Sequence, residues 1–251
     1  MHWDFAVILL FLGIAVPLLG RRRLRKLLQA PQTTKTERLV LYASTLAFQW
    51  LAAALILWRT HAHAIAPARL GLAIPHVAST LTATFLLAAL ILTNQLVSLR
   101  RLSTHPAEIR GALPQLALKI FPQDSAERLA FSALVATVAV CEELIYRGFA
   151  QRVFEDWSGG LVIAAIFGSA AMFALAHLYQ GPRGMIATLL VGLLFSVARA
   201  YTGSLVPAMV AHFIADLTAG FLTPSRLRAA QAAASRESAA TESPADSNGS
   251  F

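Results

Sequence analysis

The sequence predicts an all-α fold, a polytopic bundle of transmembrane helices. Of the 251 residues, 57% are hydrophobic and 14% are charged, whereas soluble domains are about 45–50% apolar and about 25% charged. Apolar stretches close to the roughly 20 residues that cross a bilayer core recur along most of the chain. Backbone polar groups in lipid must be paired within their own segment, so each stretch is expected to be a helix.

About seven stretches qualify as spans, and the sixth is short: 3–19, 38–58, 76–98, 129–149, 161–180, 185–199 and 204–222. The proline-containing connection before the fourth includes LPQLALKIF, which predicts a short interfacial helix. From Thr223 the residues are small and polar, which predicts a disordered tail. We therefore divide the chain into an N-terminal transmembrane region, a membrane core and a tail: 1–111, 112–222 and 223–251.

Charge patterning supports a membrane protein rather than a nucleic-acid-binding one. The net charge is +8, but the basic residues cluster at the ends of apolar runs, as in RRRLRK at 21–26. No nucleic-acid motif is present, and the main partner predicted is the lipid bilayer. Most of the 21 Lys and Arg residues fall on one side if the N-terminus is outside, so the positive-inside rule predicts N-out and C-in.

Ionisable residues lie inside the later spans, where they are costly. A charge at the bilayer centre costs at least about 2.5–3.5 kcal/mol on insertion scales, so such residues face the protein interior and usually have a function. The stretch CEELIYRGFAQ at 141–151 carries two adjacent carboxylates and an arginine, while the first two spans carry no ionisable residue in their middle. The full set is Glu142, Glu143, Arg147, His177, His212 and Asp216.

Helical spacing separates the two carboxylates. Glu143 and Arg147 are four residues apart, so they share a helix face and can pair. Glu142 is turned about 140° from Arg147 around the helix. We therefore expect Glu143 to be structural and Glu142 to be free to act.

The same spacing relates Phe173 to His177 and His212 to Asp216. The turn signal SGG at 158–160 lies nearly equidistant from Glu142 and His177 in sequence, which places both at one depth on an antiparallel hairpin if the fourth helix extends beyond its apolar run. The pattern predicts one site assembled from three helices.

Three motifs carry a family resemblance. EELIYR at 142–147, FALAH at 173–177 and HFIAD at 212–216 resemble EExxxR, FxxxH and HxxxN/D. In this order on successive late spans, they resemble the CPBP family of intramembrane peptidases. That family includes the type II CAAX prenyl endopeptidases and the bacteriocin-processing and immunity proteins. The resemblance covers about 112–222, and the segment around CEELIYRGF is similar to bacterial members.

The resemblance implies a glutamate-dependent endopeptidase that acts on peptide or lipidated-protein substrates, of prenylated CaaX or bacteriocin type, in a bacterial plasma membrane. It implies that Glu142 is the general base, that His177 orients water and that His212 and Asp216 stabilise the oxyanion. Glu143, Arg147 and Phe173 would support the site. It also implies no cofactor, although carboxylates and imidazoles are ligands that zinc accepts, so a zinc site stays open.

Two other function classes remain open. A scaffold or bacteriocin-immunity protein would use the same fold to bind a partner without catalysis. A small transporter would also carry intramembrane acids and histidines, but no inverted repeat is visible.

Four other reactive or charged residues have simpler interpretations. The lone Cys141, which excludes an internal disulfide, is expected to be a small buried hydrophobe rather than a nucleophile. His61 and His63 are expected to be solvated in an outer loop, and Arg183 to lie in a loop near a membrane face.

Overall fold

The structure, a computed structural model, describes residues 2–30, 32–104 and 112–242. This part of the chain is helical, and its single β-bridge joins Leu72 to Ser204. The all-α prediction is confirmed. The helices are α1 Trp3–Leu10, η1 Phe11–Ala15, α2 Val16–Gln29, α3 Lys35–Ala62, η2 Pro67–Leu70, α4 Val77–Thr104, α5 Ala112–Ile120, α6 Ser125–Glu143, η4 Leu144–Ala150, α7 Gln151–Trp157, α8 Val162–Ala176, η5 Leu178–Gln180, α9 Gly181–Thr202 and α10 Val206–Glu242.

The chain is an integral membrane protein. Six helical segments within the described residues are long and apolar enough to cross a bilayer, and α8 is a seventh, shorter apolar helix of 15 residues. The short helix predicted in the connection before the fourth span is present as α5. The six long segments are Trp3–Gln29, Lys35–Ala62, Val77–Arg101, Ser125–Trp157, Leu178–Thr202 and Val206–Ala229.

Two predicted boundaries are wrong, and the extension considered for the fourth helix is present. The fourth span was predicted at 129–149, and its helix continues to Trp157; beyond the apolar run, Arg152 contacts both Glu155 and Asp156. The fifth ends at Ala176 rather than 180. The sixth was expected to be short, yet it spans the 25 residues Leu178–Thr202.

The last helix also extends beyond the segment predicted to be ordered. Helix α10 continues through Pro224 to Glu242, and Leu227 is 1% exposed. The segment after Leu227 is rich in alanine, the residue with the highest helix propensity, which explains why a composition too polar for a core still forms a helix. Residues 243–251 of the predicted tail lie outside the described residues.

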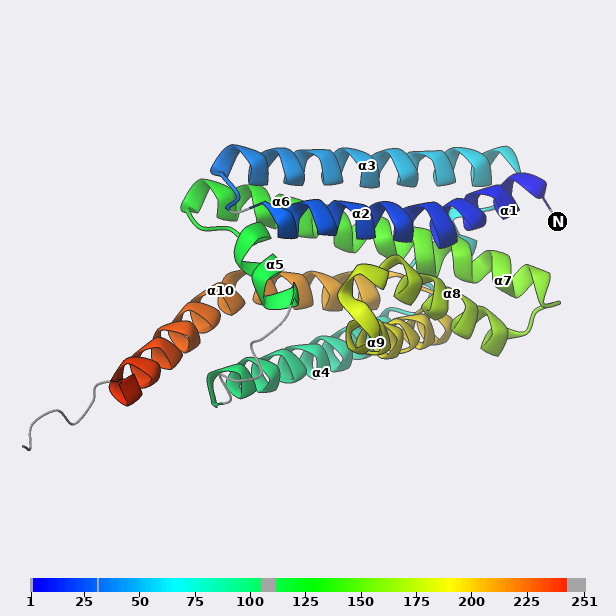
Figure 1. Cartoon of the computed structure of the whole chain (residues 1–251). Helices are drawn as coiled ribbons and strands as arrows, with labels where there is room; N and C mark the ends of the chain where they lie inside the picture. The colour runs from blue at the N-terminus through cyan, green and yellow to red at the C-terminus, as the bar shows by residue number, and fades with distance from the viewer. Residues whose placement is uncertain (1, 31, 105–111, 243–251) are drawn as a thin grey trace, which may run out of the picture.

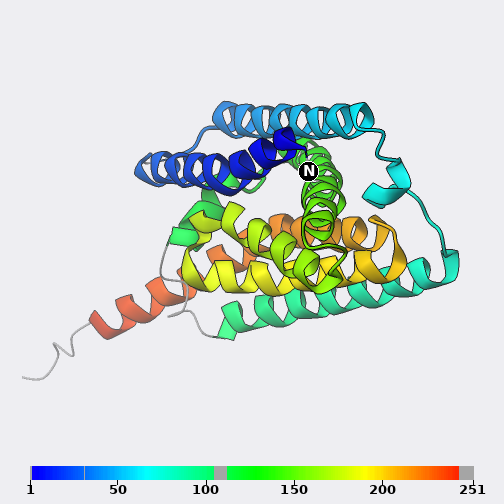
Figure 2. The ribbon, with the colours of Figure 1, turned by 90° about the vertical axis from the view of Figure 1, so that its right-hand side faces the viewer.

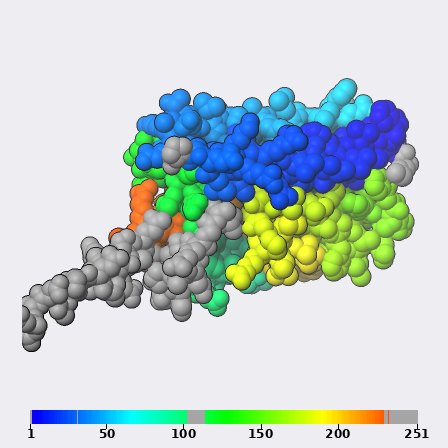
Figure 3. Space-filling view, in the orientation of Figure 1, coloured from blue at the N-terminus to red at the C-terminus, as the bar shows by residue number. Residues whose placement is uncertain are grey.

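The helix that carries the two adjacent carboxylates runs through the middle of the molecule. Figures 1 and 2 show α2 and α3 on one side and α4, α9 and α10 on the other, with α6, η4 and α7 between them. Half of the apolar window of Ser125–Trp157 is buried, against 17% for Val77–Arg101. The space-filling view shows α1 and α2 covering one side of the bundle, beside the segment that includes α9 (Figure 3).

Two devices position this central helix. At its start, Asp124 caps α6 by accepting a hydrogen bond from the Glu127 backbone N–H, and Glu127 forms an ion pair with Arg38 of α3 at 2.7 Å. At its end, Gly159 and Gly160 both have positive φ, a conformation that glycine adopts without strain. The turn therefore lies at the predicted SGG and returns the chain as α8.

Candidate active site

The helix changes its winding where the site begins. The residues after Glu143, Leu144–Ala150, form a π-helix in which all seven residues are buried. π-Helical turns are rare and occur frequently at functional sites. The wider turn lies directly after the two carboxylates and contains Arg147, so the segment that carries the first motif is locally distorted inside the protein core.

Glu143 connects two of the three motifs. Its side chain is 0% exposed, and its Oε1 accepts hydrogen bonds from Arg147 Nη1 at 3.0 Å and from His212 Nδ1 at 2.8 Å. The predicted pairing with Arg147 is confirmed. The bond to His212 fixes α10 against the central helix.

Arg147 is enclosed by aromatic rings. Its guanidinium lies 4.0 Å from the centre of the Phe173 ring and 5.3 Å from that of Phe195. Stacking on aromatic faces is favourable for a desolvated guanidinium. Gly192 makes room for it, because a Cβ there would lie 3.3 Å from Arg147 Nη2 and from Ala170. The arginine is thus a buried structural cation of the site.

Glu142 has a different environment from its neighbour. It is partly buried, and its Oε1 accepts a hydrogen bond from Gln49 Nε2 of α3 at 2.8 Å. Its Oε2 is buried and has no hydrogen-bond partner among the described residues. A neutral donor holds this carboxylate without neutralising it, in contrast to the arginine and histidine that hold Glu143.

His177 ends α8, with φ −96° and ψ 18°. Its Nδ1 lies 2.8 Å from the Phe173 carbonyl oxygen. A carbonyl only accepts, so we assign the hydrogen to Nδ1, which leaves Nε2 with a lone pair in the neutral ring. The ring is partly exposed and lies 5.7 Å, between centroids, from that of Tyr179.

His212 has a carboxylate near each ring nitrogen. Nδ1 bonds Glu143, and Nε2 lies 3.5 Å from Asp216 Oδ2. The shorter of the two contacts is the one with Glu143, at 2.8 Å. His212 is buried, whereas the Asp216 side chain is 42% exposed. At 3.5 Å the contact with Asp216 is longer than a good hydrogen bond.

Phe173 packs between the motifs. Its ring centre lies 4.6 Å from that of His177, 6.0 Å from that of His212 and 5.2 Å from that of Tyr146. Ser169 Oγ donates to the Tyr146 carbonyl at 2.8 Å, which fixes the register of α8 against η4. The structure therefore brings the three motifs together from α6, α8 and α10.

Three residues of the site escaped the sequence reasoning. Gln49 lies in the middle of a predicted span, and a search for ionisable residues missed it because its amide is neutral; polarity in mid-span was the available signal. Phe195 and Gly192 lie in an ordinary apolar run and gave no signal.

The remaining sequence expectations divide. Cys141 is fully buried, as expected of a small hydrophobe. Arg183 and His61 are exposed, as expected, but neither lies in a loop: Arg183 is in the first turn of α9 and His61 is in the last turn of α3. The expectation for His63 was wrong: its side chain is 20% exposed, and its Nε2 lies 3.0 Å from Asp4 Oδ2, because the start of α1 packs beside the end of α3.

A metal was an open alternative at the three motifs. Among the described residues, the group with three metal-ligand atoms within 4.8 Å of one another is His2, Asp4 and His63. Glu142, His177, His212 and Asp216 do not form such a group among the described residues. The cofactor question stays a prediction.

One comparison with known proteins gives a match. Residues 124–218 match the family described as type II CAAX prenyl endopeptidase Rce1-like. No curated protein and no solved structure shows significant similarity to the chain. The matched segment begins at the N-cap of α6 and ends two residues after Asp216, so it contains all three motifs. This match to a membrane protease family confirms the resemblance.

Proposed function

We propose that this chain, whose residues 124–218 form an Rce1-like domain, hydrolyses peptide bonds of membrane-associated proteins within or near the bilayer. The observation that supports this most strongly is the unequal treatment of the two adjacent carboxylates. Among the described residues each glutamate has one oxygen without a hydrogen-bond partner, but the other oxygen differs. That of the fully buried Glu143 accepts from Arg147 and His212, whereas that of the partly buried Glu142 accepts from the neutral amide of Gln49. A purely structural pair of glutamates would not need this division.

The proposed general base is Glu142. A water molecule beside its unpartnered Oε2 loses a proton to the carboxylate and attacks the carbonyl carbon of the substrate peptide. His177 accepts a hydrogen bond from the same water through Nε2 and so orients it. The new C–O bond turns the carbonyl into a tetrahedral oxyanion, and a general base in this role contributes about 10²–10⁴-fold.

The proposed oxyanion donor is His212. When both nitrogens carry a hydrogen, Nδ1–H remains on Glu143 and Nε2–H, whose contact with Asp216 is long, is available to donate to the oxyanion. Preorganised donors are most effective where water is excluded. Glu142 then returns its proton to the amide nitrogen, the C–N bond breaks, and the products are a carboxylate and an amine.

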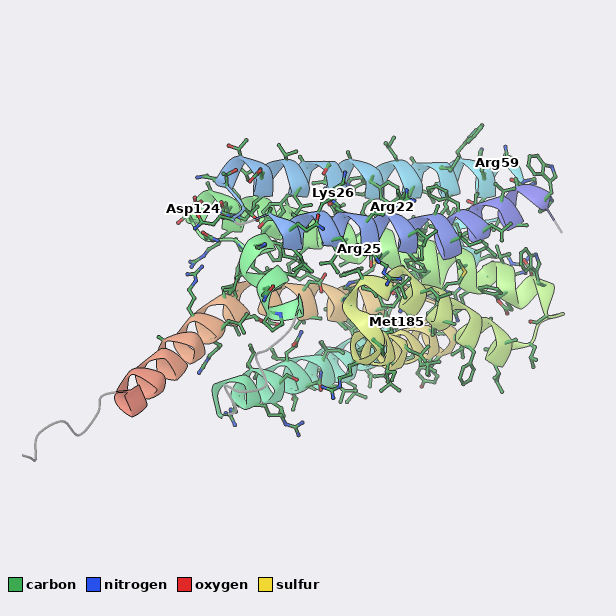
Figure 4. The ribbon with its side chains drawn as sticks, in the orientation of Figure 1. Arg22, Arg25, Lys26, Arg59, Asp124 and Met185 are labelled. Atoms are coloured by element: carbon green, nitrogen blue, oxygen red, sulfur yellow. The ribbon has the colours of Figure 1, made fainter. Side chains whose placement is uncertain are left out.

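We propose that the site opens toward the basic face of the protein. A methyl group at Gly20 would touch the Tyr179 ring, so the level of α2 at which the arginines begin lies beside the segment that follows His177. Figure 4 shows Arg22, Arg25 and Lys26 along this part of α2. The positive-inside rule assigns that face to the cytoplasm. Because the fourth span extends to Trp157, Glu142 lies near the middle of its helix.

The substrate class follows from the family and is also a proposal. A prenylated CaaX protein, or another lipidated or membrane-embedded peptide, would reach the site from the bilayer or from its inner surface. Cells that express the natural protein and cells that express Glu142→Gln at matched levels would be compared by mass spectrometry of new peptide termini in their membranes. Glu155→Gln, on the same helix beyond the site, is the matched control.

We expect termini that are present with the natural protein and with Glu155→Gln but disappear with Glu142→Gln. These termini would identify the substrate. Identical termini in all three samples, with all three proteins folded, would contradict the proposal and favour a scaffold or immunity protein on the same fold.

A further inference from the structure

A second cluster of polar side chains lies at the end of the molecule where α1 begins and α3 ends. Arg59 marks this end in Figure 4, opposite Asp124. His63 Nε2 lies 3.0 Å from Asp4 Oδ2 and 3.2 Å from Asp4 Oδ1, and Arg59 Nε donates to Asp4 Oδ2 at 2.8 Å. The His2 ring stacks on His63 with centroids 3.6 Å apart. The cluster lies outside the Rce1-like domain.

The cluster contains the donor atoms of a transition-metal site. One ligand atom from each of His2, Asp4 and His63 lies within 4.8 Å of the others. Two imidazoles and a carboxylate are ligands that zinc binds at about 2.0–2.2 Å, which requires ligand atoms a little over 3 Å apart. The spacing is therefore close to that of a formed site. His2 is exposed, so its ring can leave the stack and turn a nitrogen inward without disturbing the core.

The neighbours of His63 Nε2 point to a cation at this position. Two carboxylate oxygens of Asp4 lie within 3.2 Å of it, and Arg59 Nη2 lies at 3.4 Å. One ring nitrogen cannot donate to a carboxylate and accept from a guanidinium at the same time. A metal bound to Nε2 and to Asp4 Oδ1 would use the lone pairs of both, while Arg59 keeps its bond to Oδ2.

We propose that His2, Asp4 and His63 form a binding site for a divalent transition metal of the zinc class. Arg59 would act as an outer partner that holds the Asp4 carboxylate in position, the role that hydrogen-bonded groups behind metal ligands commonly have. Three protein ligands leave a fourth tetrahedral position open to water. Because His2 and Asp4 lie at the start of the first membrane segment and His63 lies at the end of the second, the metal would join these two segments.

The proposed metal would stabilise the contact between the N-terminal helices and the central helix. The Phe5 ring packs 5.0 Å from His63 and 5.1 Å from Phe149 of η4. A ligand that binds only the folded state raises the thermal midpoint. The proposal is independent of the proposed peptidase function, since it makes no use of Glu142 or its partners.

The test measures zinc on the full-length protein in detergent, without a histidine tag. After equilibrium dialysis against zinc chloride, bound zinc is measured by inductively coupled plasma mass spectrometry. The comparison includes His2→Ala and His63→Ala, with His61→Ala and His76→Ala as controls that remove a histidine outside the cluster. Thermal unfolding is followed with and without zinc for each protein.

We expect one zinc per chain in the natural protein and in both controls, and a raised thermal midpoint in zinc. Each cluster variant should bind zinc at least tenfold more weakly and lose the rise in midpoint. The exposed His2 makes His2→Ala decisive, because its metal-free midpoint should equal that of the natural protein. No zinc on the natural protein, or equal binding by His2→Ala and His61→Ala, would overturn the proposal and leave a hydrogen-bonded structural cluster.

Discussion

Two buried ion pairs on the same central helix differ in how completely their polar atoms are satisfied. At the start of α6, the Glu127 carboxylate accepts hydrogen bonds from two nitrogens of Arg38 and from the backbone N–H of Gln123. Arg38 also donates to the Thr33 carbonyl. At the end of α6, a single oxygen of Glu143 accepts the hydrogen bonds from both Arg147 and His212.

The second pair leaves polar atoms over. Glu143 Oε2 and Arg147 Nε and Nη2 are buried and have no hydrogen-bond partner among the described residues. Buried polar atoms in native proteins are nearly all paired, and the exceptions have explanations such as a catalytic role. The satisfied pair joins α3 to α6 and serves structure, whereas the unsatisfied pair belongs to the proposed active site.

The largest expected effect is a loss of activity when both residues of the Glu143–Arg147 pair are replaced together, compared with the same replacement of the Arg38–Glu127 pair. Replacing Arg147 by Met together with Glu143 by Leu should leave a folded protein, because apolar replacement of a whole buried pair is often neutral or stabilising. The activity should fall by at least about 10²-fold, since His212 loses the partner that orients it. The same double replacement of Arg38 and Glu127 should keep most of the activity. Peptidase turnover and thermal unfolding of both double variants check this.

The single variants provide the control for that comparison. Glu143→Leu alone strands the charge of Arg147, which should cost about 3–5 kcal/mol of stability. Equal activity in the two double variants would remove the distinction between a structural and a functional pair.

A smaller effect is expected at Gln49, which sharpens the comparison at the neighbouring carboxylate. Gln49→Leu removes the donor that holds Glu142 and should lower kcat about 10–100-fold with KM nearly unchanged, because a misplaced base costs turnover rather than binding. Gln95→Leu is the matched control, since Gln95 is also a membrane-helix glutamine and donates to the Ala215 carbonyl. A change in KM alone would assign Gln49 to substrate binding.

The smallest expected effect is on the pH dependence of the thermal midpoint, and it concerns the surface ion pair of Lys35 with Asp124. A hydrogen bond from Lys35, with the Glu127 N–H, holds the pKa of Asp124 below its ordinary value. A lowered pKa stabilises the fold above the ordinary pKa of the group, and this contribution disappears as pH falls through the lower, folded-state pKa. Asp124→Asn keeps an N-cap residue but loses the charge, so its thermal midpoint should lie slightly below that of the natural protein at neutral pH.

The difference in midpoint should vanish in acid. Thermal unfolding of both proteins across the acidic range measures it. A difference that persists at the lowest pH would mean that the cap, rather than the ion pair, is what the substitution changes.

Local periodicity let the sequence determine much of this protein. Apolar runs determined the helical membrane class, and the four-residue spacing determined that Glu143 pairs with Arg147. The glycines of SGG determined the turn before α8. Each of these features depends on residues close together in the chain, whose geometry a helix or a turn sets without help from the rest of the molecule.

Tertiary structure decided which distant groups meet. The bonds from His212 to Glu143 and from Gln49 to Glu142 join residues 69 and 93 positions apart, and the contact of His63 with Asp4 joins residues 59 apart. Helix spacing fixes the direction of a side chain around its own axis but not which helix lies opposite. Packing of α3, α6 and α10 therefore decided that Glu143 bonds His212 while Glu142 bonds Gln49.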